Sequence, residues 1–143
     1  MKRFASYILY TLLLAAIACA CSERLDIVQD YGYGIETLPL PKTVRQGESV
    51  NLEFSILREG YYSGTEYRFR YFNSEGEGIL SYRGETVRVN RFRDIDTDSF
   101  VLTWQSLGED RQQLDFVFEN SFGRRVEFTV GFDGESSGGE DNP

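Results

Sequence analysis

The sequence contains no histidine, the side chain that most often acts as a general base and binds transition metals. Its serines therefore lack the usual partner base of a nucleophilic site. The two cysteines, Cys19 and Cys21, both lie near the N-terminus, so the rest of the chain cannot form an internal disulfide. These absences predict a protein that is not an enzyme, with no cofactor, no metal ion and no small-molecule substrate. Its core must be stabilised by ordinary burial.

The N-terminus has the layout of a bacterial lipoprotein signal peptide, residues 1–20. Lys2 and Arg3 precede a charge-free stretch, 4–20, which ends at Cys21. Small residues precede both cysteines, so either one fits as the lipid attachment site. Polar sequence begins directly after Cys21, and we therefore expect Cys21 to carry the lipid. The alternative is a single transmembrane anchor, which needs roughly 20 apolar residues.

Lipidation predicts a protein of the cell envelope, held on a membrane by its acyl chains and facing the periplasm or the cell surface. We expect the outer membrane. Loss of Lys2 and Arg3 with the signal peptide would take the formal net charge from −8 to −10. Such a surface repels phosphate backbones, so no nucleic-acid partner is expected.

The mature chain divides into three parts by composition. Residues 21–31 are polar and predict a tether, and residues 133–143 are rich in Gly, Ser and acid, which predicts a disordered tail. Between them, residues 32–132 alternate apolar and polar side chains, as half-buried strands do. The expected strands lie at 33–38, 49–57, 67–72, 79–83, 86–89, 100–104, 114–119 and 126–132. About seven such strands favour an all-β, two-sheet antiparallel sandwich, with a closed barrel as the rival.

Two groups of residues are candidates for binding a partner. Tyr61 and Tyr62 lie in an expected loop, where exposed tyrosines anchor protein partners or stack on sugars. Arg83, Arg88 and Arg91, with Arg93 beside them, form the one locally basic stretch, which suits an acidic partner or lipid headgroups. The alternatives are that one tyrosine caps the core and that the arginines pair with Glu85, Asp94 and Asp96.

Three alternate aspartates, Asp94, Asp96 and Asp98, offer oxygen ligands of the kind that calcium prefers. The calcium-loop pattern fails, because its sixth position is Ser99 instead of Gly and its twelfth is Gln105 instead of Glu. We therefore expect a solvated acidic turn and no metal site.

Several short motifs, in order and spacing, resemble the TraQ family encoded by conjugative transposons of Bacteroides. They are Leu25-Asp26-Ile27, Glu36 to Lys42, Gly47-Glu48, Arg58-Glu59-Gly60, Thr65 to Phe72, Gly76-x-Gly78 and Phe116 to Gly123. Together they cover nearly the whole mature chain. The chain departs from the family pattern at Ser121 and in its acidic tail.

This resemblance implies an immunoglobulin-like sandwich encoded in a transfer operon and held in the envelope as a lipoprotein. It implies protein partners within a conjugative transfer apparatus and supplies no catalytic residues. A glycan-binding surface lipoprotein, with Tyr61 and Tyr62 as an aromatic platform, is the alternative function. A passive structural spacer is a third.

Overall fold

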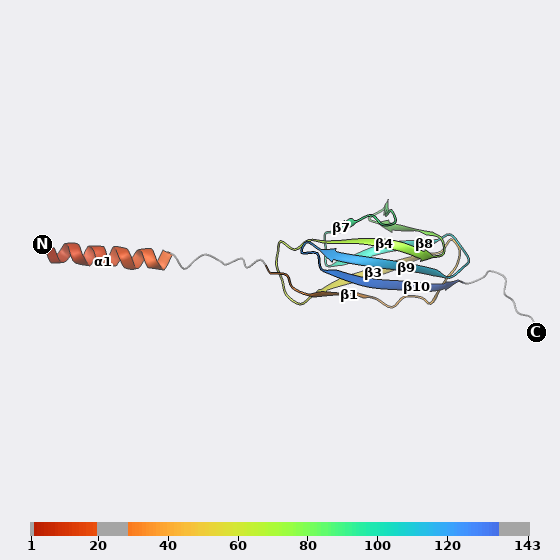
Figure 1. The fold of residues 1–143 in the computed structure, drawn as a ribbon, viewed down its shortest axis with the longest axis horizontal. Coiled ribbons are helices and arrows are strands. Elements are labelled where there is room, and N and C mark those ends of the chain that lie inside the picture. Colours follow the sequence, from red (N-terminus) through yellow and green to blue (C-terminus); the bar gives the residue numbers. More distant parts are fainter. Residues whose placement is uncertain (1, 20–28, 135–143) are drawn as a thin grey trace, which may run out of the picture.

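The computed structural model describes residues 2–19 and 29–134 (Figure 1). Residues 2–19 form helix α1 (Lys2–Cys19), and no helix in the described ranges is long and apolar enough to cross a membrane. Cys21 and residues 135–143 of the tail expected at 133–143 lie outside the described residues. The strands are β1 (Tyr33–Thr37), β2 (Thr43–Val44), β3 (Ser49–Arg58), β4 (Tyr67–Glu75), β5 (Gly78–Tyr82), β6 (Glu85–Thr86), β7 (Arg93–Ile95), β8 (Ser99–Ser106), β9 (Gln112–Asn120) and β10 (Arg125–Gly134).

The strands form two five-stranded sheets, β1-β3-β8-β5-β6 and β2-β10-β9-β4-β7. Every pairing is antiparallel except that of β2 with β10. When the longer strands are lettered A to G in chain order, β1-β3-β8-β5 becomes A-B-E-D and β10-β9-β4 becomes G-F-C. These are the two sheets of an immunoglobulin constant-type sandwich. The sheets share no ladder, so the predicted sandwich is confirmed and the barrel is wrong.

Strand β3 shows why these residues form a sandwich. Val50, Leu52, Phe54 and Ile56 are buried, and the residues between them point outward. Because side chains alternate across a strand, one face of β3 packs on the core and the other meets solvent. The alternation expected from the sequence is confirmed here and in β8 and β9.

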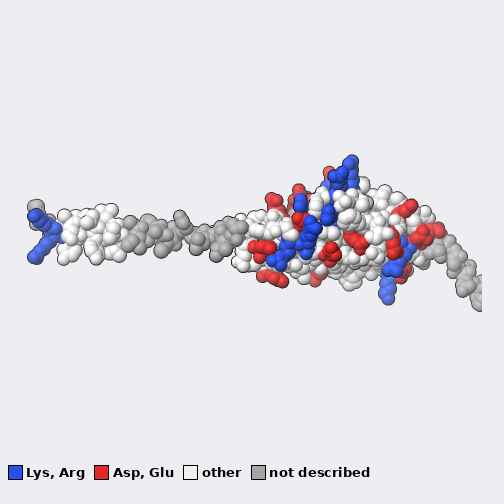
Figure 2. Space-filling model, viewed as in Figure 1, with Lys and Arg blue, Asp and Glu red and all other residues white. Residues whose placement is uncertain are grey.

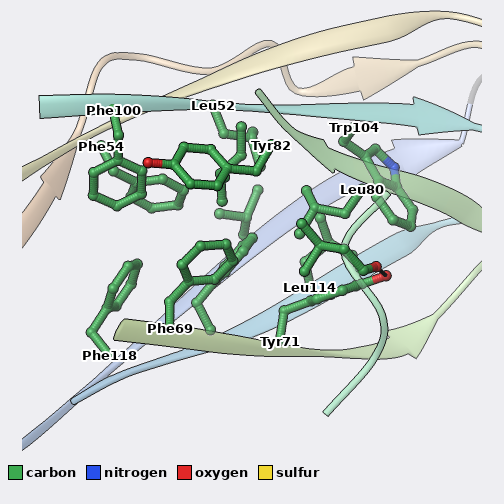
Figure 3. Packing of buried hydrophobic residues seen from close by; sticks show 14 of the residues in the cluster. Leu52, Phe54, Phe69, Tyr71, Leu80, Tyr82, Phe100, Trp104, Leu114 and Phe118 are labelled. Carbon is green, nitrogen blue, oxygen red and sulfur yellow. Dashed lines mark hydrogen bonds between the residues drawn. The ribbon is translucent and has the colours of Figure 1, made fainter. Parts of the chain in front are cut away.

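Aromatic side chains from both sheets meet in the centre of the core (Figure 3). The ring of Phe54 lies 5.1 to 5.6 Å, centroid to centroid, from the rings of Phe100, Phe116, Phe118 and Phe128. Three of these four contacts are edge-to-face, the geometry that aromatic quadrupoles favour. The second sheet supplies three of the partners, so Phe54 joins the two layers.

Trp104 is fully buried at the other end of the core, next to Leu80 (Figure 3). Its indole nitrogen donates to the side-chain oxygen of Gln112, whose amide donates to the hydroxyl of Ser106. Gly78 lies against the indole, since a Cβ there would sit 2.2 Å from Cζ2 of Trp104. A buried polar chain of this kind is stable because its members satisfy one another.

The expected strand at 86–89 is wrong, because the ladder ends at Thr86 in the short β6. Arg83 and Gly84 both have positive φ, 51° and 78°, and join β5 to β6 as a tight two-residue turn. The chain then crosses to the other sheet, where the N–H of Asn90 donates to the carbonyl of Tyr71 at 2.9 Å. We call residues 87–92 the crossing loop.

Strand β10 differs from expectation in burial and length. Val130 and Phe132 are buried as predicted, but Val126 and Phe128 are only half-buried. The strand continues to Gly134, two residues past the expected limit of the sandwich, because Asp133 and Gly134 pair with Thr43 and Val44 of β2. That pairing leaves residues 125–131 of β10 without a hydrogen-bonded strand on the outer side among the described residues, although β1 packs close by.

Candidate interaction surface

The N-terminal side of the domain is attached to the hairpin between β9 and β10. The carboxylate of Asp30 accepts hydrogen bonds from Nε and Nη2 of Arg124, at 3.1 and 3.0 Å, and from the amide of Asn120, at 3.1 Å. The Arg124 hydrogen bond holds the pKa of Asp30 below its ordinary value. The hydroxyl of Tyr33 contacts the carbonyl oxygens of Phe118 and Arg124 at 3.0 and 2.9 Å, and burial raises the pKa of Tyr33. The last part of segment 21–31, expected as a tether, is therefore bound to the sandwich.

The tyrosine loop, residues 59–66, lies at this same end of the molecule. Tyr61 is 73% exposed, and the guanidinium of Arg58 lies 5.1 Å from its ring centroid. Tyr62 is half-buried, with its ring 6.2 Å from that of Phe122. The loop therefore offers one open aromatic ring, Tyr61, instead of a platform of two.

The arginines of the basic stretch fall into two groups. Arg83 pairs with Asp96, and Arg93 pairs with Glu85. These are the structural pairings expected as the alternative to a binding role. Arg88 and Arg91 lie on the crossing loop, are exposed, and form no ion pair with any residue in the described ranges.

The structure adds two arginines of β4 to this surface, which the sequence analysis did not single out. The guanidinium carbons of Arg68 and Arg70 lie 4.0 and 4.9 Å from the ring centroid of Phe92. Figure 2 shows basic side chains gathered into a band on this side of the domain, with acidic side chains on either side of it. The pairing of β4 with β7 brings these residues together, and no local sequence signal marks it.

Two acidic residues near this band, Glu119 and Asp98, are paired with arginines. Glu119 is 8% exposed and lies 3.2 Å from Arg68 and 3.4 Å from Arg125. Asp98 pairs with Arg58 at 2.6 Å. No group of three or more Cys, Asp or Glu within residues 2–19 and 29–134 is placed to hold a metal ion.

A family model described as TraQ conjugal transfer protein matches residues 4–135. No curated protein matches the chain. Among solved structures, a conjugative transposon lipoprotein from Bacteroides eggerthii is similar, with 31% identity, a TM-score of 0.68, and coverage of 72% of this chain and 98% of its own.

A lipoprotein from Bacteroides thetaiotaomicron has 33% identity and a TM-score of 0.67, and the match covers 80% of this chain and 89% of that one. A conjugate transposon protein from Bacteroides vulgatus, solved in solution as residues 27–141, has 27% identity and a TM-score of 0.67. The match covers 85% of this chain and 99% of that one. On the extent of the model match and these identities, the chain belongs to the TraQ conjugal transfer protein family.

Proposed function

We propose that this protein is a lipid-anchored, non-enzymatic component of a conjugative transfer apparatus that docks another protein of that apparatus. Its family is one of conjugal transfer proteins, and similar structures are conjugative transposon lipoproteins. Anchoring would proceed through Cys21, eight residues before the first described residue of the domain. A chain of that length reaches at most roughly 30 Å, so the sandwich would stay close to the membrane.

The observation that carries the docking role is a pair of arginines on the crossing loop, Arg88 and Arg91, whose side chains form no ion pair with the described part of the chain. In a chain with a formal net charge of −8, neighbouring Arg83 and Arg93 are paired with carboxylates, whereas Arg88 and Arg91 extend into solvent. Arginine is enriched where proteins bind one another, because its planar guanidinium binds carboxylates through two hydrogen bonds. An acidic surface on a partner protein fits this loop.

Conjugation frequency tests the proposal directly. Deleting the gene should lower transfer of the element, and the double variant Arg88→Gln/Arg91→Gln should lower it without changing the melting temperature. The double variant Lys42→Gln/Arg111→Gln removes the same charge from other exposed positions and is the matched control. Normal transfer in the deletion strain would refute a role in transfer, and normal transfer in the Arg88/Arg91 variant would refute docking through this loop.

The anchor is tested by incorporation of labelled palmitate. We expect Cys21→Ser to abolish incorporation and Cys19→Ser to preserve it. Incorporation that survives Cys21→Ser but not Cys19→Ser would move the lipid to Cys19, and no incorporation into the unaltered chain would remove the anchor altogether.

A second candidate function is glycan binding at the tyrosine loop, favoured by the open ring of Tyr61 beside Arg58. Exposed aromatic faces stack on sugar rings. A glycan array probed with the domain and with Tyr61→Ala would decide, because a glycan site requires signals that the variant loses. An array without signals would exclude this function.

A further inference from the structure

On the side opposite β9, strand β10 has a long edge with which no strand of the described residues pairs, apart from β2 at its end. It pairs with β9 without interruption from Arg125 to Phe132. On its other side, β2 pairs only with Asp133 and Gly134. Figure 1 shows β10 at the margin of its sheet, so residues 125–131 form an outer edge.

The hydrogen-bonding pattern identifies which backbone groups face outward. The N–H of Asn120 donates to the carbonyl of Arg124 at 3.0 Å, which makes this a hydrogen-bonded pair of the antiparallel ladder. Such pairs recur every second residue, so the even-numbered residues of β10 bond to β9. The backbone N–H and C=O groups of the odd-numbered residues point away from β9. The N–H of Asp133 is an example, since it donates to the carbonyl of Lys42 at 2.7 Å.

Four residues therefore offer backbone groups on the open edge: Arg125, Glu127, Thr129 and Gly131. No backbone hydrogen bond to another described segment is formed by any of them on that side. Their donors and acceptors are spaced as a strand requires.

Apolar side chains lie along the same margin. Val126 and Phe128 of β10, Ile35 of β1, and Leu40 between β1 and β2 are all half-buried and pack against the core. An added strand beside β10 would cover them with its own inward-facing side chains. This edge of β10 thus combines unpaired backbone N–H and C=O groups with half-buried apolar side chains next to them.

Natural proteins usually protect such an edge with proline, lysine, a bulge or a short strand. Residues 125–131 contain no proline and no lysine, and their register with β9 shows no bulge. The opposite edge of this sheet is covered, since β7 and the crossing loop run along β4. Charged side chains also protect an edge, and among the described residues Arg125 and Glu127 are the protection that this edge of β10 carries, two charges that a complementary strand can pair with.

We propose that residues 125–131 of β10 accept an extended segment of a partner protein as an added strand. This inference rests on the proposed docking function and specifies a site for it. The segment would carry apolar residues at alternate positions, to cover Val126 and Phe128. On its other face it would carry an acidic residue opposite Arg125 and a basic residue opposite Glu127, because opposite charges across a ladder are favourable. Backbone bonds give such a complex its affinity, and the pockets for alternate side chains give its specificity.

Amide hydrogen exchange tests whether the edge is open in the absence of the partner. The sample is the domain comprising residues 29–143, whose hydrophobic core lies wholly between Tyr33 and Phe132. The amides of Glu127 and Thr129 should exchange quickly, and those of Val126 and Phe128, which bond to β9, should be protected. Protection at Glu127 and Thr129 would mean that a second copy or the chain itself fills the edge, and would overturn the proposal.

Proline substitution tests whether the edge is used. Thr129→Pro removes an outward N–H and is compatible with an edge strand, so the domain should fold. Transfer should fall by about tenfold, because a partner carbonyl loses its donor in a covered interface. Thr129→Ala keeps the N–H and should transfer normally, while Glu127→Pro provides a second test should Thr129→Pro unfold the domain.

The outcomes separate this inference from the function on which it rests. Gene deletion that lowers transfer, together with folded proline variants that transfer normally, would overturn the strand-addition site and leave the docking function intact. A photoreactive residue at position 129 in transferring cells supplies the identity of the occupant. Crosslinks to an extended apolar segment of one transfer protein support the proposal, and crosslinks to a second copy of this chain overturn it.

Discussion

The carboxylate of Asp30 and the guanidinium of Arg124 are joined by two hydrogen bonds although 94 positions separate them in the chain. Asp30 is the last charged residue before the sandwich begins, and Arg124 directly precedes β10. The segment leading toward the proposed anchor is therefore attached to the start of the proposed docking strand. In the proposed anchored protein, this contact would limit how far that strand can lie from the membrane.

The Asp30–Arg124 contact predicts a depressed pKa that depends on one partner. Carbon-detected NMR titration should place the pKa of Asp30 below its ordinary value of 3.8, chiefly because of the Arg124 hydrogen bond. Arg124→Gln should raise it toward that value. Arg125→Gln is the control, because Arg125 pairs with Glu119 instead.

The same contact sets a direction for the pH dependence of stability. A carboxyl whose folded pKa is depressed contributes stability that is present above its unfolded value and is lost as the pH falls through the folded pKa. The contribution of Asp30 should thus be present at pH values above its ordinary pKa of 3.8 and be lost as the pH falls through the lower pKa of the folded state. Chemical unfolding of the unaltered domain and of Asp30→Asn should give a stability difference that vanishes at low pH, and a constant difference would contradict this assignment.

Phe54 predicts a large effect of truncation, because it packs against rings of both sheets. Phe54→Ala should lower the free energy of unfolding by about 3–5 kcal/mol, the range for emptying an aromatic site in a core. Leu57→Ala, on the same strand but 49% exposed, should change it by less than about 0.5 kcal/mol. Urea unfolding monitored by far-ultraviolet dichroism measures both, and equal losses would refute the inward position of Phe54.

The contrast between Phe54 and Phe128 shows how far sequence alone predicts this molecule. Alternation identifies which face of each strand is apolar, and it placed the inward residues of β3, β8 and β9 correctly. It cannot show which strand lies at an edge, because strand order depends on contacts between distant segments. Phe128 therefore read as a core residue and is half-exposed at the margin of the sheet.

The interaction surface was predictable to a smaller extent, for the same reason. Local composition singled out Arg88 and Arg91, yet it could not separate them from Arg83, whose partner Asp96 lies 13 positions away. It also missed Arg68 and Phe92, which come together only when β7 pairs with β4. A sequence gives the positions of the charged residues, but which of them form ion pairs depends on how the fold brings distant segments together.

The Trp104–Gln112 contact predicts a coupled pair in the core. Gln112→Leu would leave the indole N–H buried without an acceptor, which should lower the free energy of unfolding by about 1–3 kcal/mol. Gln113→Leu, one residue along and half-buried, should have a much smaller effect.

A double-mutant cycle with Trp104→Phe measures the coupling. Once the indole is gone, Gln112→Leu no longer strands a donor, so the double variant should be more stable than the sum of the single losses implies. Strict additivity in denaturant unfolding would show that this hydrogen bond is absent.

The turn between β5 and β6 yields a prediction that depends on backbone conformation alone. Arg83 has φ of 51°, in the left-handed region, where asparagine is tolerated and a β-branched residue is strained. Arg83→Asn and Arg83→Val both remove the ion pair with Asp96, so a difference in stability between them reports the backbone preference of the new residue. Arg83→Val should be less stable than Arg83→Asn by about 1–2 kcal/mol, the strain of a left-handed residue.

Thermal unfolding of the two variants, followed by dichroism, provides the measurement. Because two-residue turns of this type fix the register of a hairpin, the strain in Arg83→Val should also loosen the start of the crossing loop. The side chains of Arg88 and Arg91 would then be held less firmly, and transfer should fall more in Arg83→Val than in Arg83→Asn. Equal stability of the two variants would contradict the left-handed conformation.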